Sequence, residues 1–157
     1  MAGIMSKEEC RKISIHQFPW GPDTQENLAL NDITITLYHK TDNYYISLKN
    51  KWLKKTIKIV IEKKYFEDIF IQINTVNFDK LYSENSTGDD GRELEIEIYK
   101  KEGLKKHLKR VELFSPYPDD NKMETRKIFE IIKNIKDKVN FNDYYKIIRA
   151  KRRGKNE

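Results

Sequence analysis

Apolar and polar residues alternate strictly from Glu93 to Tyr99, with leucine or isoleucine at every second position and mostly glutamate between them. A period of two is that of a β-strand with one buried face. A second run, Leu108 to Phe114, follows after a charged segment that contains Gly103. The two runs predict an antiparallel hairpin whose connection spans residues 100–107, with Gly103 free to adopt a positive φ.

Four earlier runs carry strand patterns of the same kind. The last three are separated by short polar links, which predicts an antiparallel meander. The first is short and is expected to form a first or edge strand. In chain order the runs are Cys10 to His16, Asp32 to His39, Tyr44 to Lys49 and Trp52 to Glu62.

Two stretches change to the helical period, in which apolar residues recur at every third or fourth position. These are Tyr65 to Val76 and a later helix that starts near Asn121 and reaches Val139. Between the first helix and the hairpin, Tyr82 and two apolar neighbours are expected to contact the core. After the second helix, the segment Phe141 to Ala150 reads as a short helix or a packed arm.

The element order is therefore β, β-β-β, α, β-β, α, α. It predicts an α+β two-layer sandwich, with a mainly antiparallel sheet of five to six strands and two to three helices on one face. No repeat or Gly/Ser-rich linker divides the chain, so residues 1–157 are expected to form a single domain. Residues 1–9 and 150–157 are expected to be flexible termini, and Met5 is an alternative start.

The composition is that of a polar globular chain, with 38% hydrophobic and 36% charged residues. The single cysteine, Cys10, excludes an internal disulfide, so nothing favours an oxidising compartment. No apolar run approaches the roughly 20 residues of a membrane span. The first residues lack the continuous apolar core of a secretory signal. These observations predict a cytoplasmic protein that does not enter membranes.

The net charge of +6 is concentrated in the C-terminal segment. Six basic residues and Glu157 give that segment +5, which leaves about +1 for everything before it. Such a segment is a candidate phosphate-binding site for nucleic acid, and the alternative is a solvated terminus. The basic residues are Lys146, Arg149, Lys151, Arg152, Arg153 and Lys155.

Catalytic and metal-binding motifs are weakly represented. No histidine has a second histidine or a cysteine at ligand spacing, and His39 matches only half of an H-x-T phosphoesterase pair. Glu62 and Lys64 form an E-x-K that, with Asp42 or Asp32, resembles the Mg²⁺ site of restriction-type nucleases. In a chain so rich in lysine and glutamate this motif arises by chance. We therefore expect no enzyme, no cofactor and no metal.

The strongest candidate partner surface is an acidic ridge on the first strand of the hairpin. It would attract a cation or a basic partner, and the alternative is a solvated sheet face. Lys109 and Arg110 on the paired strand are expected to neutralise part of its charge. The ridge comprises Asp89, Asp90, Glu93, Glu95 and Glu97.

A turn at Gly88 to Gly91, the acidic strand, a strand ending in Phe114-Ser115-Pro116 and an isoleucine-rich helix form one pattern. The pattern resembles small bacterial α+β proteins of the polymorphic-toxin immunity type, best over Asp89 to Pro116. That resemblance implies no catalytic residue. It implies a binding protein that neutralises a partner toxin. The alternatives are a nucleic-acid-binding accessory protein that uses the basic C-terminal segment, and thirdly a Mg²⁺-dependent nuclease.

Overall fold

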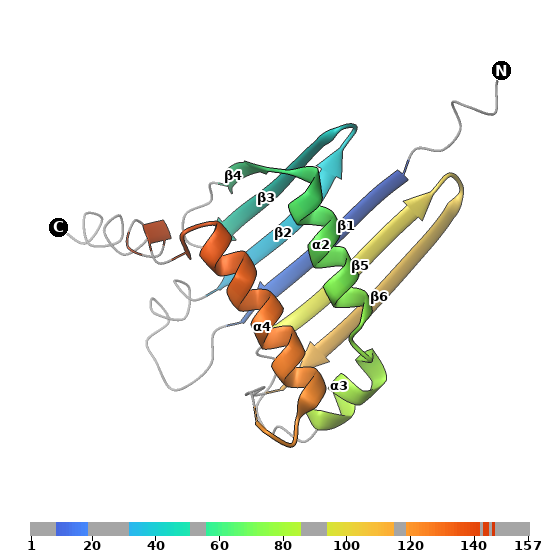
Figure 1. Ribbon diagram of the computed structural model, residues 1–157, viewed down its shortest axis with the longest axis vertical. Helices are drawn as coiled ribbons and strands as arrows, with labels where there is room; N and C mark the ends of the chain where they lie inside the picture. Colours follow the sequence, from blue (N-terminus) through green and yellow to red (C-terminus); the bar gives the residue numbers. More distant parts are fainter. Residues whose placement is uncertain are drawn as a thin grey trace.

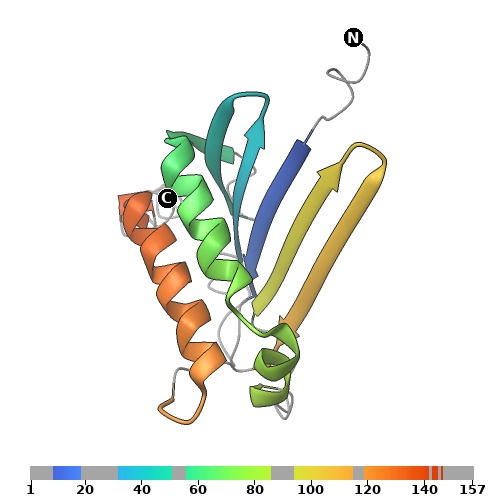
Figure 2. The ribbon, with the colours of Figure 1, turned by 45° about the vertical axis from the view of Figure 1, so that its right-hand side comes forward.

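A computed structural model shows a six-stranded sheet with helices packed on one face (Figures 1 and 2). Every pair of neighbouring strands is antiparallel. This confirms the predicted α+β two-layer sandwich. The structure describes residues 9–18, 32–50, 56–85, 94–114, 119–141, 143–144 and 146.

The strands follow the spatial order β4-β3-β2-β1-β5-β6 (Figure 1). The chain therefore builds the two halves of the sheet outward from its first strand. The bounds are β1 Glu9–Gln17, β2 Ile33–Lys40, β3 Asn43–Asn50, β4 Thr56–Ile61, β5 Leu94–Glu102 and β6 Lys105–Leu113.

Of the two alternatives predicted for this run, a first strand or an edge strand, the edge position is wrong, because β1 is the first strand in the chain but a central strand of the sheet. Lys12, for example, pairs with Tyr38 of β2 on one side and with Tyr99 of β5 on the other. Ile13 and Ile15 are both fully buried, as the centre of a sheet requires. Alternation reports the two faces of a strand and carries no information about how many neighbours it pairs with.

Helices α2, Lys63–Asn74, and α4, Met123–Lys138, supply the second layer. Their buried side chains pack with the apolar rows of the sheet into one core, as their helical period predicted. The helical part of this core is Phe66, Ile69, Phe70, Ile73, Ile128, Ile131, Ile132 and Ile135. Within the described residues, no helix is long and apolar enough to cross a membrane.

A short helix, α3 (Phe78–Glu84), follows α2, where the sequence predicted only core contacts. Its seven residues are too few to display a period, although Asn77 caps it by accepting a hydrogen bond from the Lys80 N–H at 3.1 Å. Leu81 is fully buried as expected. The predicted core contact of Tyr82 is wrong, because this side chain is 50% exposed.

The β5–β6 hairpin is longer than its predicted form. Its connection is the two-residue turn Gly103–Leu104 rather than residues 100–107, and Gly103 has the expected positive φ of 59°. Lys105 to Arg110 are all exposed. The hairpin thus extends past the side of α2 (Figure 1). In this exposed part the two strands are joined by backbone pairing, and no buried apolar face in the sequence indicates them.

Beyond α4 the chain packs back onto the core. Phe141 and Tyr144 are helical, Tyr144 is buried and Phe141 packs against the core cluster. The Nζ atom of Lys136 lies 4.7 Å from the centroid of the Phe141 ring. The predicted packing of this segment is confirmed for these two aromatic residues.

Candidate functional site

One face of the sheet is not covered by the described helices, which all lie on the other side (Figure 2). We call it the open face. Because side chains alternate along each strand, the residues between the buried isoleucines and leucines point to this face. They include tyrosines, lysines, serines and threonines, so the open face is polar with large aromatic groups among its residues.

The pairing register aligns one row of these residues across all six strands. Lys12 of β1 lies between Tyr38 and Tyr99, and Tyr38 in turn pairs with Tyr45. The row ends on the two edge strands, and we call it the tyrosine stripe. Its members, from β4 to β6, are Val60, Tyr45, Tyr38, Lys12, Tyr99 and Leu108.

Lysine ammonium groups contact the tyrosine rings of the stripe. The Tyr38 and Tyr45 ring centroids are 5.4 Å apart, and Lys58 Nζ lies 4.1 Å from the Tyr45 centroid. Lys12 Nζ lies 5.8 Å from the centroid of Tyr99. These are cation–π distances, which orient both the ring and the cation. The stripe is therefore an ordered aromatic surface.

The ends of the stripe are its most exposed apolar residues. Val60 is 72% exposed and Leu108 is 61% exposed. Isolated surface valines and leucines are common, but these two continue the line of half-buried tyrosines across the sheet. The result is an extended amphipathic surface of the kind that protein interfaces use.

An acidic corner lies beside the stripe on β5 and β6. Arg110 Nη2 is 2.9 Å from Glu95 and 3.1 Å from Glu112, and its Nε is 3.5 Å from Glu97. Three carboxylates thus surround one guanidinium. The hydrogen bond to Glu95 and the adjacent carboxylates raise the pKa of Arg110.

The structure brings together part of the predicted acidic ridge. Glu95 and Glu97 lie side by side on the open face and are joined there by Glu112, which the sequence interpretation did not include. Arg110 neutralises them partly, as expected. Lys109 does not, because it points to the helix-covered face opposite Ile98. Asp89, Asp90 and Glu93 lie outside the described residues.

The predicted phosphate-binding segment is described only at its first member. Lys146 is helical and exposed. The other five basic residues, Arg149, Lys151, Arg152, Arg153 and Lys155, lie outside the described residues, so the proposed contact of this segment with nucleic acid stays a prediction.

The structure separates one of the two candidate aspartates of the nuclease motif, Asp32, from Glu62. Asp32 precedes β2 and contacts His16, whose Nε2 atom is 2.7 Å from Asp32 Oδ1. Glu62 follows β4 at the opposite end of the sheet, near the β2–β3 turn that contains Asp42. In the described part of the chain, no group of three His, Cys, Asp or Glu residues is arranged to hold a metal ion.

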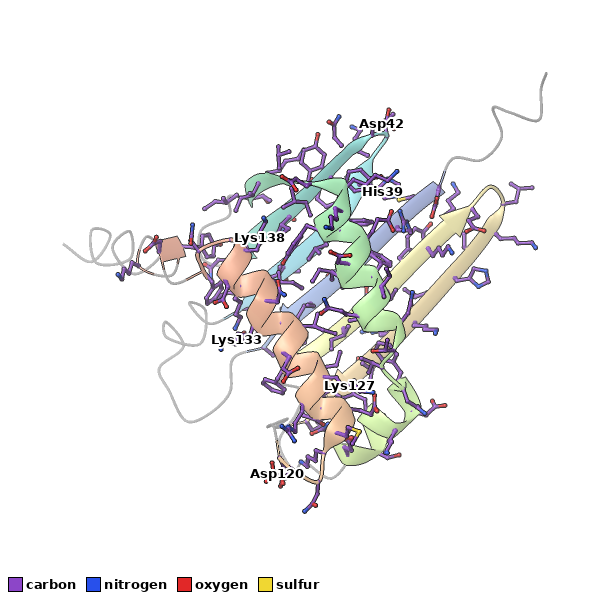
Figure 3. The ribbon with its side chains drawn as sticks, viewed as in Figure 1. His39, Asp42, Asp120, Lys127, Lys133 and Lys138 are labelled. Atoms are coloured by element: carbon purple, nitrogen blue, oxygen red, sulfur yellow. The ribbon has the colours of Figure 1, made fainter. Side chains whose placement is uncertain are left out.

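His39 has a structural environment in β2 (Figure 3). Its Nε2 atom accepts a hydrogen bond from the Arg11 backbone N–H at 3.1 Å, and its Nδ1 lies 3.4 Å from the Thr41 carbonyl oxygen. This places the ring proton on Nδ1. The ring also stacks on Tyr44 of β3, so the two nitrogens and one ring face of His39 contact β1, the β2–β3 turn and β3.

The sequence did not predict the tyrosine stripe, although it did predict on which face of the sheet some of the tyrosines lie. Alternation already placed Tyr38 and Tyr99 on the side opposite the isoleucines. Only the register of β1 between β2 and β5 shows that both rings flank Lys12.

No known protein-family model matches this chain, and no curated protein is significantly similar to it. The functional argument therefore depends on the geometry of the open face.

Proposed function

We propose that this protein binds another protein through its open face and inhibits it. The observation that carries the proposal is the tyrosine stripe, which crosses all six strands and ends in the exposed Val60 and Leu108. Tyrosine rings offer a large contact area with few rotatable bonds, and interfaces concentrate binding energy at such residues.

The stripe is already ordered before binding. Its tyrosines and Lys12 lie on strands that are paired on both sides, and lysines contact the rings. Binding through this surface therefore costs less side-chain and backbone entropy than binding through a flexible segment would. This favours the open face as the principal contact over the basic C-terminal segment, whose residues 150–157 the sequence predicts to be a flexible terminus.

The charges around the stripe indicate the partner's chemistry. The acidic corner, with three carboxylates around one guanidinium, lies two residues along β5 from Tyr99, and Lys101 and Lys106 lie on the other side of the stripe. A surface with acidic groups on one side of the stripe and lysines on the other orients a partner whose basic patch faces the acidic corner. The immunity-type resemblance favours a toxin with a basic surface as that partner.

Single-stranded nucleic acid is the competing occupant, since bases stack on tyrosines that neighbour lysines. A phosphate backbone that follows the stripe would pass beside the carboxylates of Glu97 and Glu112. Repulsion at that corner favours a protein partner.

The test begins with a pull-down from the native host and identification of the captured protein. The double variant Tyr45→Ser/Tyr99→Ser should then weaken binding of that protein about 100-fold, because interface tyrosines contribute on the order of 1–2 kcal/mol each. Tyr82→Ser is the matched control, since Tyr82 is an exposed tyrosine on α3 outside the open face. It should change the dissociation constant by less than about twofold.

Two further measurements separate the outcomes. Expression of the captured protein alone should stop cell growth, and co-expression of the wild-type chain, but not of the double variant, should restore it. A gel shift with a single-stranded oligonucleotide that depends on Tyr45 and Tyr99 would instead assign the stripe to nucleic acid. Equal affinities of the wild-type chain and the double variant for the captured protein would exclude the open face as its binding site.

A further inference from the structure

A groove on the helix-covered side of the sheet is lined mainly by residues of α2 and of the β5–β6 hairpin. Its volume is about 330 Å³, which is the size of a small-molecule site. Because it is on the opposite side of the sheet from the tyrosine stripe, it is independent of the proposed partner surface. The lining residues are Arg11, Glu67, Phe70, Ile71, Asn74, Ile98, Lys100, His107 and Lys109.

The walls of the groove are apolar. Phe70 and Ile71 come from α2 and Ile98 comes from β5. Ile71 is 64% exposed, although Phe70 and Ile73 on the same helix are buried. An apolar chain inserted between α2 and β5 would remove part of the Ile71 side chain from water, which is favourable.

Arg11 lines the groove and is held by an ion pair and by two aromatic rings. Its Nη1 and Nη2 atoms donate to the two carboxylate oxygens of Glu67 at 2.8 and 2.5 Å. Its guanidinium carbon lies 5.1 Å from the Phe66 ring centroid and 5.3 Å from that of Phe70. The charge of Arg11 is therefore compensated within the protein, so this residue shapes the groove without adding free positive charge.

Among the described residues, the hairpin side of the groove has one cation without a counterion. Lys100 is paired with Glu102 at 3.0 Å. Lys109 makes no hydrogen bond, ion pair or ring contact within the described part of the chain, and the neighbouring imidazole of His107 is likewise free there. Lys109 occupies a helix-side position opposite Ile98, in the series whose next members, Val111 and Leu113, are buried.

We propose that this groove binds a small amphipathic monocarboxylate, with its hydrocarbon part between α2 and β5 and its carboxylate on Lys109. A single charge matches the single uncompensated ammonium, and a charge-assisted hydrogen bond fixes the orientation of the ligand. His107 also lines the groove, and a nitrogen of its ring offers a second hydrogen-bonding group for the carboxylate.

Lys109 lies on the edge strand β6, and its charge has a competing explanation, namely that it prevents β6 from pairing with strands of other chains. The two roles differ in what a charge-removing substitution does. Loss of edge protection promotes self-association, whereas loss of a ligand contact weakens binding of the carboxylate alone.

The probe is octanoate, titrated by calorimetry into the full chain, with 1-octanol as the uncharged analogue. We expect saturable millimolar or tighter binding of octanoate and much weaker binding of octanol. Lys109→Gln should weaken octanoate binding about tenfold, as loss of one charge-assisted contact does. Lys106→Gln is the matched control, because Lys106 is exposed on the same strand but points to the open face. It should leave octanoate affinity within about twofold.

The amide signals of Ile71 and Ile98 should shift on octanoate addition, and that of Tyr38 should not. Absence of saturable binding, equal binding of octanol, or equal effects of the two lysine substitutions would each overturn the proposal. Self-association of Lys109→Gln with unchanged octanoate affinity would assign the lysine to edge protection.

Discussion

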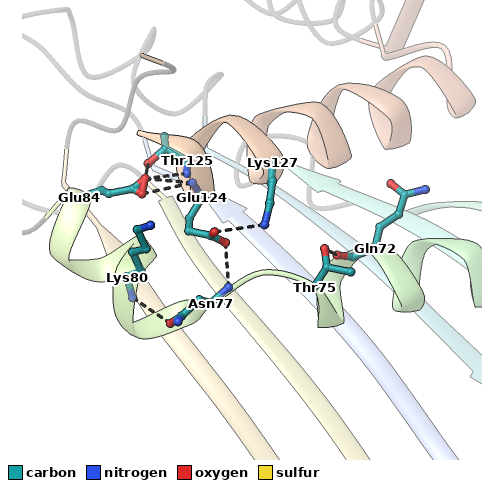
Figure 4. Close-up of polar contacts among 8 residues, drawn as sticks. All are labelled: Gln72, Thr75, Asn77, Lys80, Glu84, Glu124, Thr125 and Lys127. Carbon is teal, nitrogen blue, oxygen red and sulfur yellow. Dashed lines mark hydrogen bonds and ion pairs between the residues drawn. The ribbon is translucent and has the colours of Figure 1, made fainter. Parts of the chain in front are cut away.

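Glu84 of α3 caps the start of α4 at Thr125. Its Oε1 atom accepts hydrogen bonds from the Thr125 N–H at 3.1 Å and from the Thr125 hydroxyl at 3.2 Å (Figure 4). Glu84 also accepts from the Glu124 N–H. The N-cap residue of α4 itself, Lys122, makes no side-chain cap. A carboxylate from another helix thus satisfies N–H groups that would otherwise lack a partner, and it suits the positive end of the helix dipole.

Glu84→Ala should therefore lower the free energy of unfolding by about 1–3 kcal/mol, because two backbone donors lose a charged acceptor. Glu130→Ala, at an exposed position of α4, should change it by less than about 0.5 kcal/mol. Chemical denaturation of both variants checks this, and coincident midpoints would mean that Glu84 does not stabilise α4.

Acid should weaken the same junction through Glu124. Burial raises the pKa of this carboxyl, but the Asn77 N–H, which donates at 2.8 Å, and Lys127 outweigh burial and lower it overall from 4.5. A lowered folded pKa means that the stabilisation is complete above pH 4.5 and is lost as the pH falls toward the folded value. Denaturation between pH 6 and pH 3 should show a shallower loss of stability for Glu124→Gln than for the wild type. Glu130→Gln should retain the wild-type slope.

Two isoleucines on the helical layer should differ strongly in their contribution to stability. Ile132 of α4 is 7% exposed within the core, whereas Ile71 of α2 is 64% exposed. Ile132→Ala should cost about 2–5 kcal/mol through lost burial and the cavity left behind. Ile71→Ala should cost less than about 1 kcal/mol, since alanine is also the better helix former. Urea denaturation of the two variants measures both, and similar midpoints would contradict the assigned helix faces.

The β2–β3 turn contains backbone strain that a substitution should relieve. Thr41, a β-branched residue, has a φ of 59°, and the two-residue turn Thr41–Asp42 joins the paired Lys40 and Asn43. Only glycine adopts positive φ freely, and glycine is preferred at the first position of turns with this geometry. Thr41→Gly should raise the melting temperature by a few degrees, corresponding to about 0.5–1 kcal/mol. A fall in melting temperature on calorimetry would show that the threonine side chain stabilises the turn.

Electrostatic steering should depend on the acidic corner. The double variant Glu97→Gln/Glu112→Gln leaves the Glu95–Arg110 pair intact and removes two charges from the open face. Association with the captured partner should slow several-fold at low salt and by much less at high salt, because salt screens exposed charges. Deletion of residues 149–157 should leave the rate unchanged in stopped-flow measurements. The opposite result would move the principal contact to the basic segment.

The sequence by itself determined which side chains face the core and hence the two-layer architecture. Strict alternation around Ile96 and the helical spacing around Ile132 are direct consequences of backbone geometry, since each period places one set of side chains on one side. Burial is encoded locally in this way. The same alternation also identified the glutamates that face away from the core, including Glu95 and Glu97.

Only the tertiary structure decided which strands are neighbours. Backbone hydrogen bonds are the same for every residue, so β1 carries no local mark of its central place between β2 and β5. That place aligns Lys12 with Tyr38 and Tyr99 and creates the tyrosine stripe. The same reason applies to Glu84, which reaches Thr125 only because α3 and α4 meet in space, forty-one positions apart in the chain.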